Sequence, residues 1–370
     1  MIIKTKDFQN SCKCILTAVD ASSGNLVNDA LEVKAGDNKV ILNVTNGEYY
    51  ASVSCQAGCS FGELDAVVDA KLFLSLVAKM TVADIELEIV GNVLVLKGNG
   101  EYKLPMLATE DGMLKLDKID VGEEISSFSI DTAILSSINK FNSKELLKSG
   151  VRTNINKMFY VDETGCITFG SGACVNEFSL PSTLRILLTE KLVRLFGLFK
   201  TKDVGFTLGV VGMPNGSTQQ RVRFKNDFAE VTAIVSSDAA MLDSVPAKAI
   251  RALANKSCSG VVEVDCRELF ETLSRLSLFA GKNATPYSKF VFDKDTITVY
   301  DTTGENKEVI KLVQQANIAE PYECTLNAQD LMLTLDGVEE QYVTVGFGDH
   351  RAVVVIRPKI KNVLAECRMR

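Results

Sequence analysis

The stretch that decides the fold begins with residues 68–77, VDAKLFLSLV, which are typical of a helix with one apolar face. Three segments rich in β-branched and apolar residues follow it, namely 85–90 (IELEIV), 92–96 (NVLVL) and 101–107 (EYKLPML). Short segments of this kind, separated by glycine or asparagine, are typical of strands. The stretch therefore predicts one helix followed by three strands.

The same order of elements is written twice more along the chain. The second copy consists of 188–196 (LTEKLVRLF), 205–208 (GFTL), 221–224 (RVRF) and 229–234 (AEVTAI). The third copy consists of 326–333 (LNAQDLML), 342–347 (YVTVGF) and 352–358 (AVVVIRP). The copies recur about every 120 residues, which is the size of a whole domain and too long for a solenoid repeat.

Each copy also has an earlier half with a helix and strands of its own. The helices are marked by apolar residues at helical spacing, around Phe8, Ile138 and Leu273. The alternation in 221–224 indicates sheets with one buried and one solvated face. We therefore predict an α+β fold with three tandem similar domains, each with two helices packed on antiparallel sheets, at residues 1–122, 123–250 and 251–370.

Composition limits the class of protein. The chain has 370 residues, 46% of them apolar, which is enough for two or three folded domains. No run of about 18 apolar residues predicts a membrane span, and the first residues lack the apolar segment of an export signal, so we expect a cytoplasmic protein. The ten cysteines are isolated or in close pairs, which favours buried, reduced thiols.

Catalytic and metal-binding signals are weak. His350 is the only histidine, so neither a histidine-based triad nor a site with several histidines can form. Cys12 with Cys14, and Cys55 with Cys59, have no second pair at matching spacing. The glycines at 91–100 lie between strands, where a phosphate-binding loop would need a following helix. We expect no enzyme activity, no metal and no cofactor.

The helices carry a more informative pattern of positive charge. Five of the six predicted helices present lysine or arginine, although the net charge of the chain is −7. For a single helix, an ordinary solvated face explains such a pattern; repetition in equivalent helices favours a basic lining that faces phosphates. The residues concerned are Lys6, Lys13, Lys71, Lys79, Lys140, Lys144, Lys148, Lys191, Arg194, Lys200, Arg267 and Arg275.

At this point the chain resembles a known family, the bacterial or phage β sliding clamps, which are the β subunits of DNA polymerase III. The resemblance is carried by the threefold repeat and, in the first copy, by 71–77, 85–87 and 102–105. It implies a closed ring of two chains, with helices lining the hole. Such a ring encircles duplex DNA without reading its sequence, is placed there by a clamp loader, and tethers the replicative polymerase for processive synthesis.

The resemblance implies a homodimer seam between the first domain of one chain and the third domain of the other. The matching apolar positions are Tyr102, Leu104, Met106, Leu278 and Phe279. Lys97 or Lys103 is expected to pair with Glu305 or Glu308 across the seam. By position alone, Leu278 and Phe279 could equally belong to the domain core.

The resemblance also implies a pocket between the second and third domains that takes a short peptide from partner proteins. The matching positions are Ile155, Ser171, Ala173, Val175, Met241, Leu242, Ser244, Val245, Val355, Ile356 and Pro358. Three departures concern these surfaces. The turn at 171–175 lacks the family's basic pair, and the chain continues past Pro358 as a C-terminal extension that could cover the pocket. An aromatic pair at the DNA-facing rim is replaced by Thr153 and Asn154, while Arg152 remains as a DNA-facing residue.

Two other functions stay open at this stage. One is an interaction scaffold with the clamp fold that does not encircle DNA, which the missing rim aromatics and the acidic sixth helix favour. The other is an enzyme that uses carboxylates or cysteines, which the single histidine argues against.

Overall fold

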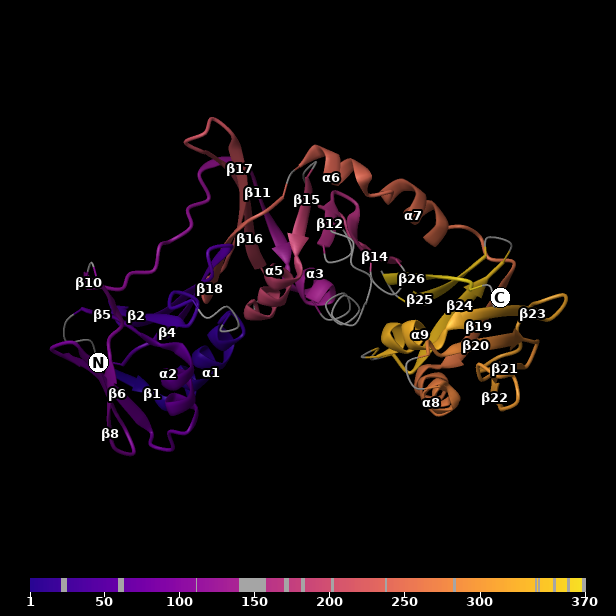
Figure 1. The fold of residues 1–370 in the computed structure, drawn as a ribbon, viewed down its shortest axis with the longest axis horizontal. Helices are drawn as coiled ribbons and strands as arrows, with labels where there is room; N and C mark the ends of the chain where they lie inside the picture. The colour runs from indigo at the N-terminus through magenta and orange to yellow at the C-terminus, as the bar shows by residue number, and fades with distance from the viewer. Residues whose placement is uncertain are drawn as a thin grey trace. The chain divides into compact units, whose positions relative to one another are not determined.

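The computed structural model describes residues 1–20, 25–58, 63–110, 112–139, 158–169, 173–180, 184–200, 203–236, 238–281, 284–336, 338, 340–348, 351–357 and 360–367. The chain forms two compact units. Unit 1 comprises Met1–Ser136 and Lys191–Ser236, and unit 2 comprises Ser137–Glu190 and Ser237–Arg370. The fold and its element labels are drawn in Figure 1.

Unit 1 contains two main sheets. The smaller has the order β1-β6-β7-β8, formed by β1 (Ile2–Lys4), β6 (Asp84–Val90), β7 (Val93–Lys97) and β8 (Glu101–Pro105). The larger has the order β11-β16-β17-β18-β4-β3-β2-β5, formed by β11 (Glu123–Asp131), β16 (Asp203–Gly212), β17 (Thr218–Lys225), β18 (Ala229–Ile234), β4 (Tyr49–Gln56), β3 (Lys39–Thr45), β2 (Ala30–Gly36) and β5 (Leu64–Asp69). A short ribbon pairs β9 (Ala108–Thr109) with β10 (Gly112–Met113).

The helices of unit 1 include α1 (Thr5–Leu16), α2 (Ala70–Ala78) and the 3-10 helix η2 (Leu195–Leu198). Two more helices cross a boundary between the units along the chain, α3 (Thr132–Ser137) and α5 (Glu190–Arg194). Phe8 of α1 and Phe73 of α2 are fully buried and meet edge to face, with ring centroids 6.0 Å apart. This contact holds the two helices against each other over the core.

Unit 2 has the same two kinds of sheet. The larger has the order β15-β12-β13-β14-β26-β25-β24-β19, formed by β15 (Arg185–Thr189), β12 (Met158–Asp162), β13 (Gly165–Phe169), β14 (Ala173–Glu177), β26 (Ile360–Ala365), β25 (Ala352–Arg357), β24 (Tyr342–Phe347) and β19 (Gly260–Asp265). The smaller has the order β22-β21-β20-β23, formed by β22 (Lys307–Lys311), β21 (Thr296–Tyr300), β20 (Tyr287–Phe292) and β23 (Tyr322–Asn327).

The helices of unit 2 include α6 (Ala239–Ser244), α7 (Ala247–Ala254), α8 (Cys266–Leu276), the 3-10 helix η3 (Ser277–Phe279) and α9 (Ala328–Leu335). Helices α8 and α9 lie side by side (Figure 1). Phe292 stacks on Phe347, which stacks on Tyr322, with centroids 4.6 Å apart in each pair. Together with apolar residues of α8 and α9, these rings form the core between the two sheets.

Every pair of strands in the described residues is antiparallel. In β20 and β21 burial alternates residue by residue, which confirms sheets with one buried and one solvated face. The predicted α+β fold class is therefore confirmed.

A strand–helix junction repeats along the chain. In the described part, six helices begin directly where a strand ends: α1, α2, α3, α5, α8 and α9. At several of these junctions the last residue of the strand caps the helix. Asp69 accepts a hydrogen bond from the Leu72 backbone (2.7 Å), Asp265 from Glu268 (2.9 Å) and Asn327 from Gln329 (3.0 Å). The sequence predicted a helix followed by strands, and the structure adds that a strand and its capping residue lead into these helices.

The structure differs from the expectation that the residues after Pro358 form a C-terminal extension that could cover the pocket. Residues 360–365 are not an appendage; they form β26, an inner strand of the eight-stranded sheet between β14 and β25. Ile360, Val363 and Leu364 are buried, so this segment is part of the core and not a cover over a pocket.

The two compact units do not coincide with the three predicted domains. The strands of the predicted second domain are shared, because β11, β16, β17 and β18 lie in unit 1 while β12 to β15 lie in unit 2. β18 pairs with β4 in unit 1, and β14 pairs with β26 in unit 2, so one continuous sheet runs through each unit. The boundaries at 1–122, 123–250 and 251–370 stay a prediction.

Candidate nucleic-acid and partner interfaces

Four of the predicted DNA-facing residues lie on the helix pair of unit 1. Lys6 and Lys13 are exposed on α1, while Lys71 on α2 and Lys79 at its C-terminal cap are also exposed. Gln9 of α1 donates hydrogen bonds to the backbone carbonyls of Val77 and Met80 (both 2.9 Å), which fixes α1 beside the end of α2. None of the four lysines forms an ion pair with a described residue.

The predicted DNA-facing residues at 191–200 are also exposed, and Lys191 has an acidic partner. Nζ of Lys191 on α5 donates to Asp20 at 2.7 Å, and this hydrogen bond raises the pKa of Lys191. Asn46 donates to the same carboxylate. Arg194 and Lys200 are exposed.

The predicted cations of the third domain are engaged by carboxylates. Arg267 Nε lies 2.8 Å from Glu271 Oε1, one turn further along α8. Arg275 donates from Nε and Nη2 to the two carboxylate oxygens of Glu308 on β22, at 2.9 and 2.6 Å. These hydrogen bonds lower the pKa of Glu308, so the pair stays ionised.

Seven predicted site residues lie outside the described residues. They are Lys140, Lys144, Lys148, Arg152, Ile155, Ser171 and Pro358.

Most of the predicted seam residues lie on or beside two edge strands and at one helix end, while Lys97 lies on the inner strand β7. β8 is an edge strand of the smaller sheet of unit 1, and β22 is an edge strand of the smaller sheet of unit 2. Leu278 and Phe279 of η3 have exposed fractions of 82% and 54%, so they are not core residues. Leu104 has an exposed fraction of 2% and packs inside unit 1, while Tyr102 and Met106 are half-buried.

The charged seam residues mostly have partners within the chain. Lys97 Nζ lies 2.8 Å from Glu88, and Lys103 Nζ lies 3.6 Å from Glu101 on its own strand. Glu308 is held by Arg275, whereas Glu305 is exposed. The predicted cross-seam pairs of Lys97 and Glu308 therefore compete with partners that are already in place.

Most described residues of the predicted peptide pocket come together on one face of the larger sheet of unit 2. Val175, Leu242 and Val245 are buried in one apolar cluster, and Met241 and Ile356 pack against it. Val355 points the other way, into the core formed with α8 and α9. Ala173 is half-buried on β14, and Ser244 caps α6 by donating to Met241 O at 2.6 Å.

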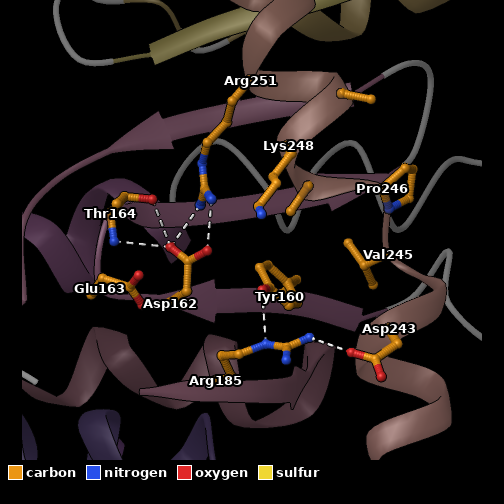
Figure 2. Close-up of a pocket in the computed structure, with 12 residues that line it drawn as sticks. Tyr160, Asp162, Glu163, Thr164, Arg185, Asp243, Val245, Pro246, Lys248 and Arg251 are labelled. Atoms are coloured by element: carbon orange, nitrogen blue, oxygen red, sulfur yellow. Dashed lines mark hydrogen bonds and ion pairs between the residues drawn. The ribbon is translucent and has the colours of Figure 1, made fainter. Parts of the chain in front are cut away.

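A cavity of about 870 Å³ adjoins this cluster at Val245 and is lined by β12, β15 and the corner between α6 and α7. Figure 2 shows Arg251 of α7 pointing down to Asp162 at the end of β12. Arg251 Nη1 and Nη2 donate to the two carboxylate oxygens of Asp162 at 2.6 and 2.8 Å. Nearby, Arg185 donates from Nε to Tyr160 Oη (3.3 Å) and from Nη2 to Asp243 (2.8 Å).

The electrostatics of this cavity are set by paired charges. Burial acts to raise the pKa of Asp162, but hydrogen bonds from Arg251 and Thr164 outweigh it and the pKa is lowered. Sequence reasoning missed these residues because no motif marks them. The available signal was the helical spacing of apolar residues in 247–254, AKAIRALA, which places Arg251 on an amphipathic helix.

The remaining chemistry-bearing residues show no reactive arrangement in the part of the chain that is described. The nine described cysteines form no disulfide with one another, and seven of them are buried. Burial raises the pKa of Cys266 to about 11, so its thiol is protonated near neutral pH. No group of three or more histidine, cysteine or acidic side chains in this part could hold a metal. No described helix is long and apolar enough to cross a membrane.

Comparison by sequence finds no matching family model and no matching curated protein. Comparison by structure finds matches over the whole chain. A DNA polymerase III beta subunit from Thermotoga maritima matches with a TM-score of 0.78 and 15% identity, covering 100% of this chain and 99% of that chain. A DnaN sliding clamp from Pseudomonas aeruginosa, solved bound to griselimycin, matches with a TM-score of 0.79 and 13% identity over the same shares. The Helicobacter pylori beta clamp matches with a TM-score of 0.76 and 12% identity, covering 100% of both chains.

These matches agree with the repeated strand–cap–helix junctions and with the paired sheets of each unit. The matches cover the whole chain at low sequence identity, so these proteins share the backbone fold with this chain. The chain therefore has the sliding-clamp fold, that of the bacterial DNA polymerase III beta subunits.

Proposed function

We propose that this protein is a DNA sliding clamp: a non-catalytic homodimeric ring that encircles duplex DNA and tethers a replicative polymerase. The observation that carries the proposal is the full-length match to sliding clamps, at TM-scores of 0.78 and 0.79. The double-stranded DNA, the clamp loader, the polymerase and a second copy of the chain are its proposed partners.

The exposed lysines of α1 and α2 support a surface that faces DNA phosphates. Lysine contacts to phosphates are independent of base sequence, which suits a protein that must move along the duplex. A closed ring retains DNA by its topology, so a few weak contacts suffice. The acidic exterior implied by a net charge of −7 disfavours binding of DNA from outside the ring.

The open edges of β8 and β22 support closure by pairing between two copies. The backbone N–H of Met106 donates to Asn92 O, so it points towards the neighbouring strand β7. Successive residues of an antiparallel strand point their backbone N–H and C=O groups to opposite sides, so those of Glu101 and Lys103 face away from β7. Leu312 donates to Asp295 O, so those of Val309 and Lys311 likewise face away from β21.

Charge favours one antiparallel register between these edges. With Lys103 opposite Val309, Glu101 lies opposite Lys311, and no lysine faces a lysine directly. Exposed Leu278 and Phe279 next to the seam would then be covered, and both edge strands would be paired.

The partner-peptide site is proposed at the apolar cluster around Val175, Leu242 and Val245, beside the cavity of Figure 2. A short peptide with large apolar side chains would contact half-buried Met241 and Ile356 at the edge of this cluster. The cavity offers room next to them, with Arg185 and Lys248 exposed for polar contacts.

The test is retention on DNA of different topology. After loading by a clamp loader onto nicked circular DNA, the protein is expected to co-elute with the circle in gel filtration and to be lost within minutes once a restriction enzyme linearises it. Ends release a topologically held ring but not a protein bound by local contacts. Equal retention on circular and linear DNA would contradict the proposal.

A second function, a clamp-fold scaffold that does not encircle DNA, is favoured by one observation. The arginines of α8 are paired with glutamates, and α9 carries acidic Asp330, so these helices offer phosphates no free positive charge. A stable monomer at micromolar concentration would favour this scaffold.

A further inference from the structure

The two described helix pairs of the same kind differ in charge. On α1, Lys6 and Lys13 are seven residues apart and Asn10 lies between them on the same exposed face. On α2, Lys71 and Ser75 share an exposed face, which Lys79 continues at the C-terminal cap. The exposed surface of this pair therefore carries four lysines and one carboxylate on the helices, that of Asp7.

Few carboxylates offset these lysines. Asp7 is the only acidic residue of α1, and α2 has none. Within the described residues, no carboxylate forms an ion pair with Lys6, Lys13, Lys71 or Lys79. In solution their counterions are therefore mobile ions, which a phosphate can displace with a gain in entropy.

The pair formed by α8 and α9 has the opposite character. The two arginines of α8 are matched by Glu268 and Glu271 on the same helix, and both are held by carboxylates at 2.9 Å or less. On α9 the only charged residue is Asp330. A phosphate that approached Arg275 would have to displace Glu308, which binds it through two hydrogen bonds, and would be repelled by it.

We propose, as an extension that rests on the proposed ring, that duplex phosphates are contacted through the α1–α2 face and that the α8–α9 face makes no net phosphate contact. The positive lining is then uneven: of the two helix pairs compared, each protomer attracts the duplex with α1–α2 and not with α8–α9. In a two-fold ring this gives two equivalent off-centre positions for the DNA on opposite sides of the hole. Short-lived contacts at either position leave the duplex free to slide.

The experiment measures binding of the purified dimer to a fluorescent 30-base-pair duplex over a range of salt concentrations. In the test variant Lys6, Lys13, Lys71 and Lys79 are all changed to Gln. Its affinity at low salt is expected to fall at least tenfold, and the slope of log K against log salt to become shallower by about 3.6, since each of the four lost phosphate contacts removes about 0.9.

Two control variants separate this surface from net charge. The first changes four exposed lysines on strands and turns, Lys39, Lys115, Lys256 and Lys294, to Gln. The second changes Arg267 and Arg275 to Gln. Both are expected to leave the slope unchanged within about 0.5, which is less than one phosphate contact.

A slope reduced equally by the helix-pair variant and the first control would overturn the inference, as would a reduction of one or more by the arginine variant. If the fourfold variant melts at a lower temperature than the wild type, the double variants Lys6→Gln/Lys13→Gln and Lys71→Gln/Lys79→Gln are measured separately. Each is expected to reduce the slope by about half as much as the fourfold variant.

The retention test on circular DNA is independent of this experiment. Loss from circles contradicts the proposed function, while normal retention with unchanged slopes contradicts only the uneven lining.

Discussion

The carboxyl group of Asp162 shows how one residue organises a local site. Its side chain is 8% exposed and accepts hydrogen bonds from Arg251 on α7 and from Thr164 in the following turn. A buried carboxylate is stable only when such partners replace its lost hydration. The pair therefore ties the connecting helix α7 to the end of β12.

Replacing Asp162 with Asn is expected to lower the free energy of unfolding by about 2 to 3 kcal/mol at pH 7, because Arg251 is left half-buried without a counter-charge. In the folded state the pKa of Asp162 is lowered from 3.8, so its contribution is complete above that value and is lost as the pH falls through the lowered pKa. Urea unfolding curves of wild type and variant are thus expected to differ at pH 7 and to converge as the pH falls below the lowered pKa of Asp162.

Asp243→Asn provides the matched control, since it removes the carboxylate that pairs with Arg185 at an exposed position. Its effect is expected to stay below about 1 kcal/mol, because water screens exposed ion pairs. A loss as large as that of Asp162→Asn would show that burial does not set the strength of the first pair.

At the scale of the element, the strand–cap–helix junction is the repeating device of the fold. Sequence periodicity predicted the helices around Phe8, Phe73 and Leu273, and the structure confirms them as α1, α2 and α8. It missed the short strands that lead into them, such as β1 and β19, and the connecting helix α7. Short strands carry too few residues to show a period, and α7 spans the predicted domain boundary at residue 250, where no helix was expected.

Asp265→Ala is expected to lower the free energy of unfolding by about 1 kcal/mol, because Asp265 accepts hydrogen bonds from the backbone of Arg267 (3.0 Å) and Glu268 (2.9 Å) at the start of α8. Asp265→Asn keeps an acceptor and is expected to lose only a few tenths of a kcal/mol. Urea unfolding of both variants measures the difference. Equal losses would mean that the negative charge, and not the cap, is what stabilises the helix.

At the scale of the whole molecule, the proposed function requires two copies to close through β8 and β22. Phe279→Asp is expected to convert the dimer into monomers in sedimentation velocity. The change acts at both seams of the ring, and losing the burial of one phenylalanine at each seam weakens the dimer by at least about 100-fold.

Leu26→Asp is the control for this change, since Leu26 is 44% exposed and lies outside both edge strands. It is expected to leave the dimer intact. A Phe279→Asp protein that still sediments as a dimer would move the seam away from η3.

By itself the sequence determined the α+β class, the threefold repetition and the apolar faces of the helices, because these depend on local periodicity and recur in each copy. Only the tertiary structure decided the rest. It showed that residues 360–365 are an inner strand and that Leu104 is buried while Phe279 is exposed. It also showed that Arg267 and Arg275 are engaged by glutamates whereas Lys6 and Lys71 have no described ion-pair partner. Strand neighbours and ion pairs join residues that can be far apart in the chain, as Arg275 and Glu308 are, and local patterns carry no record of such contacts.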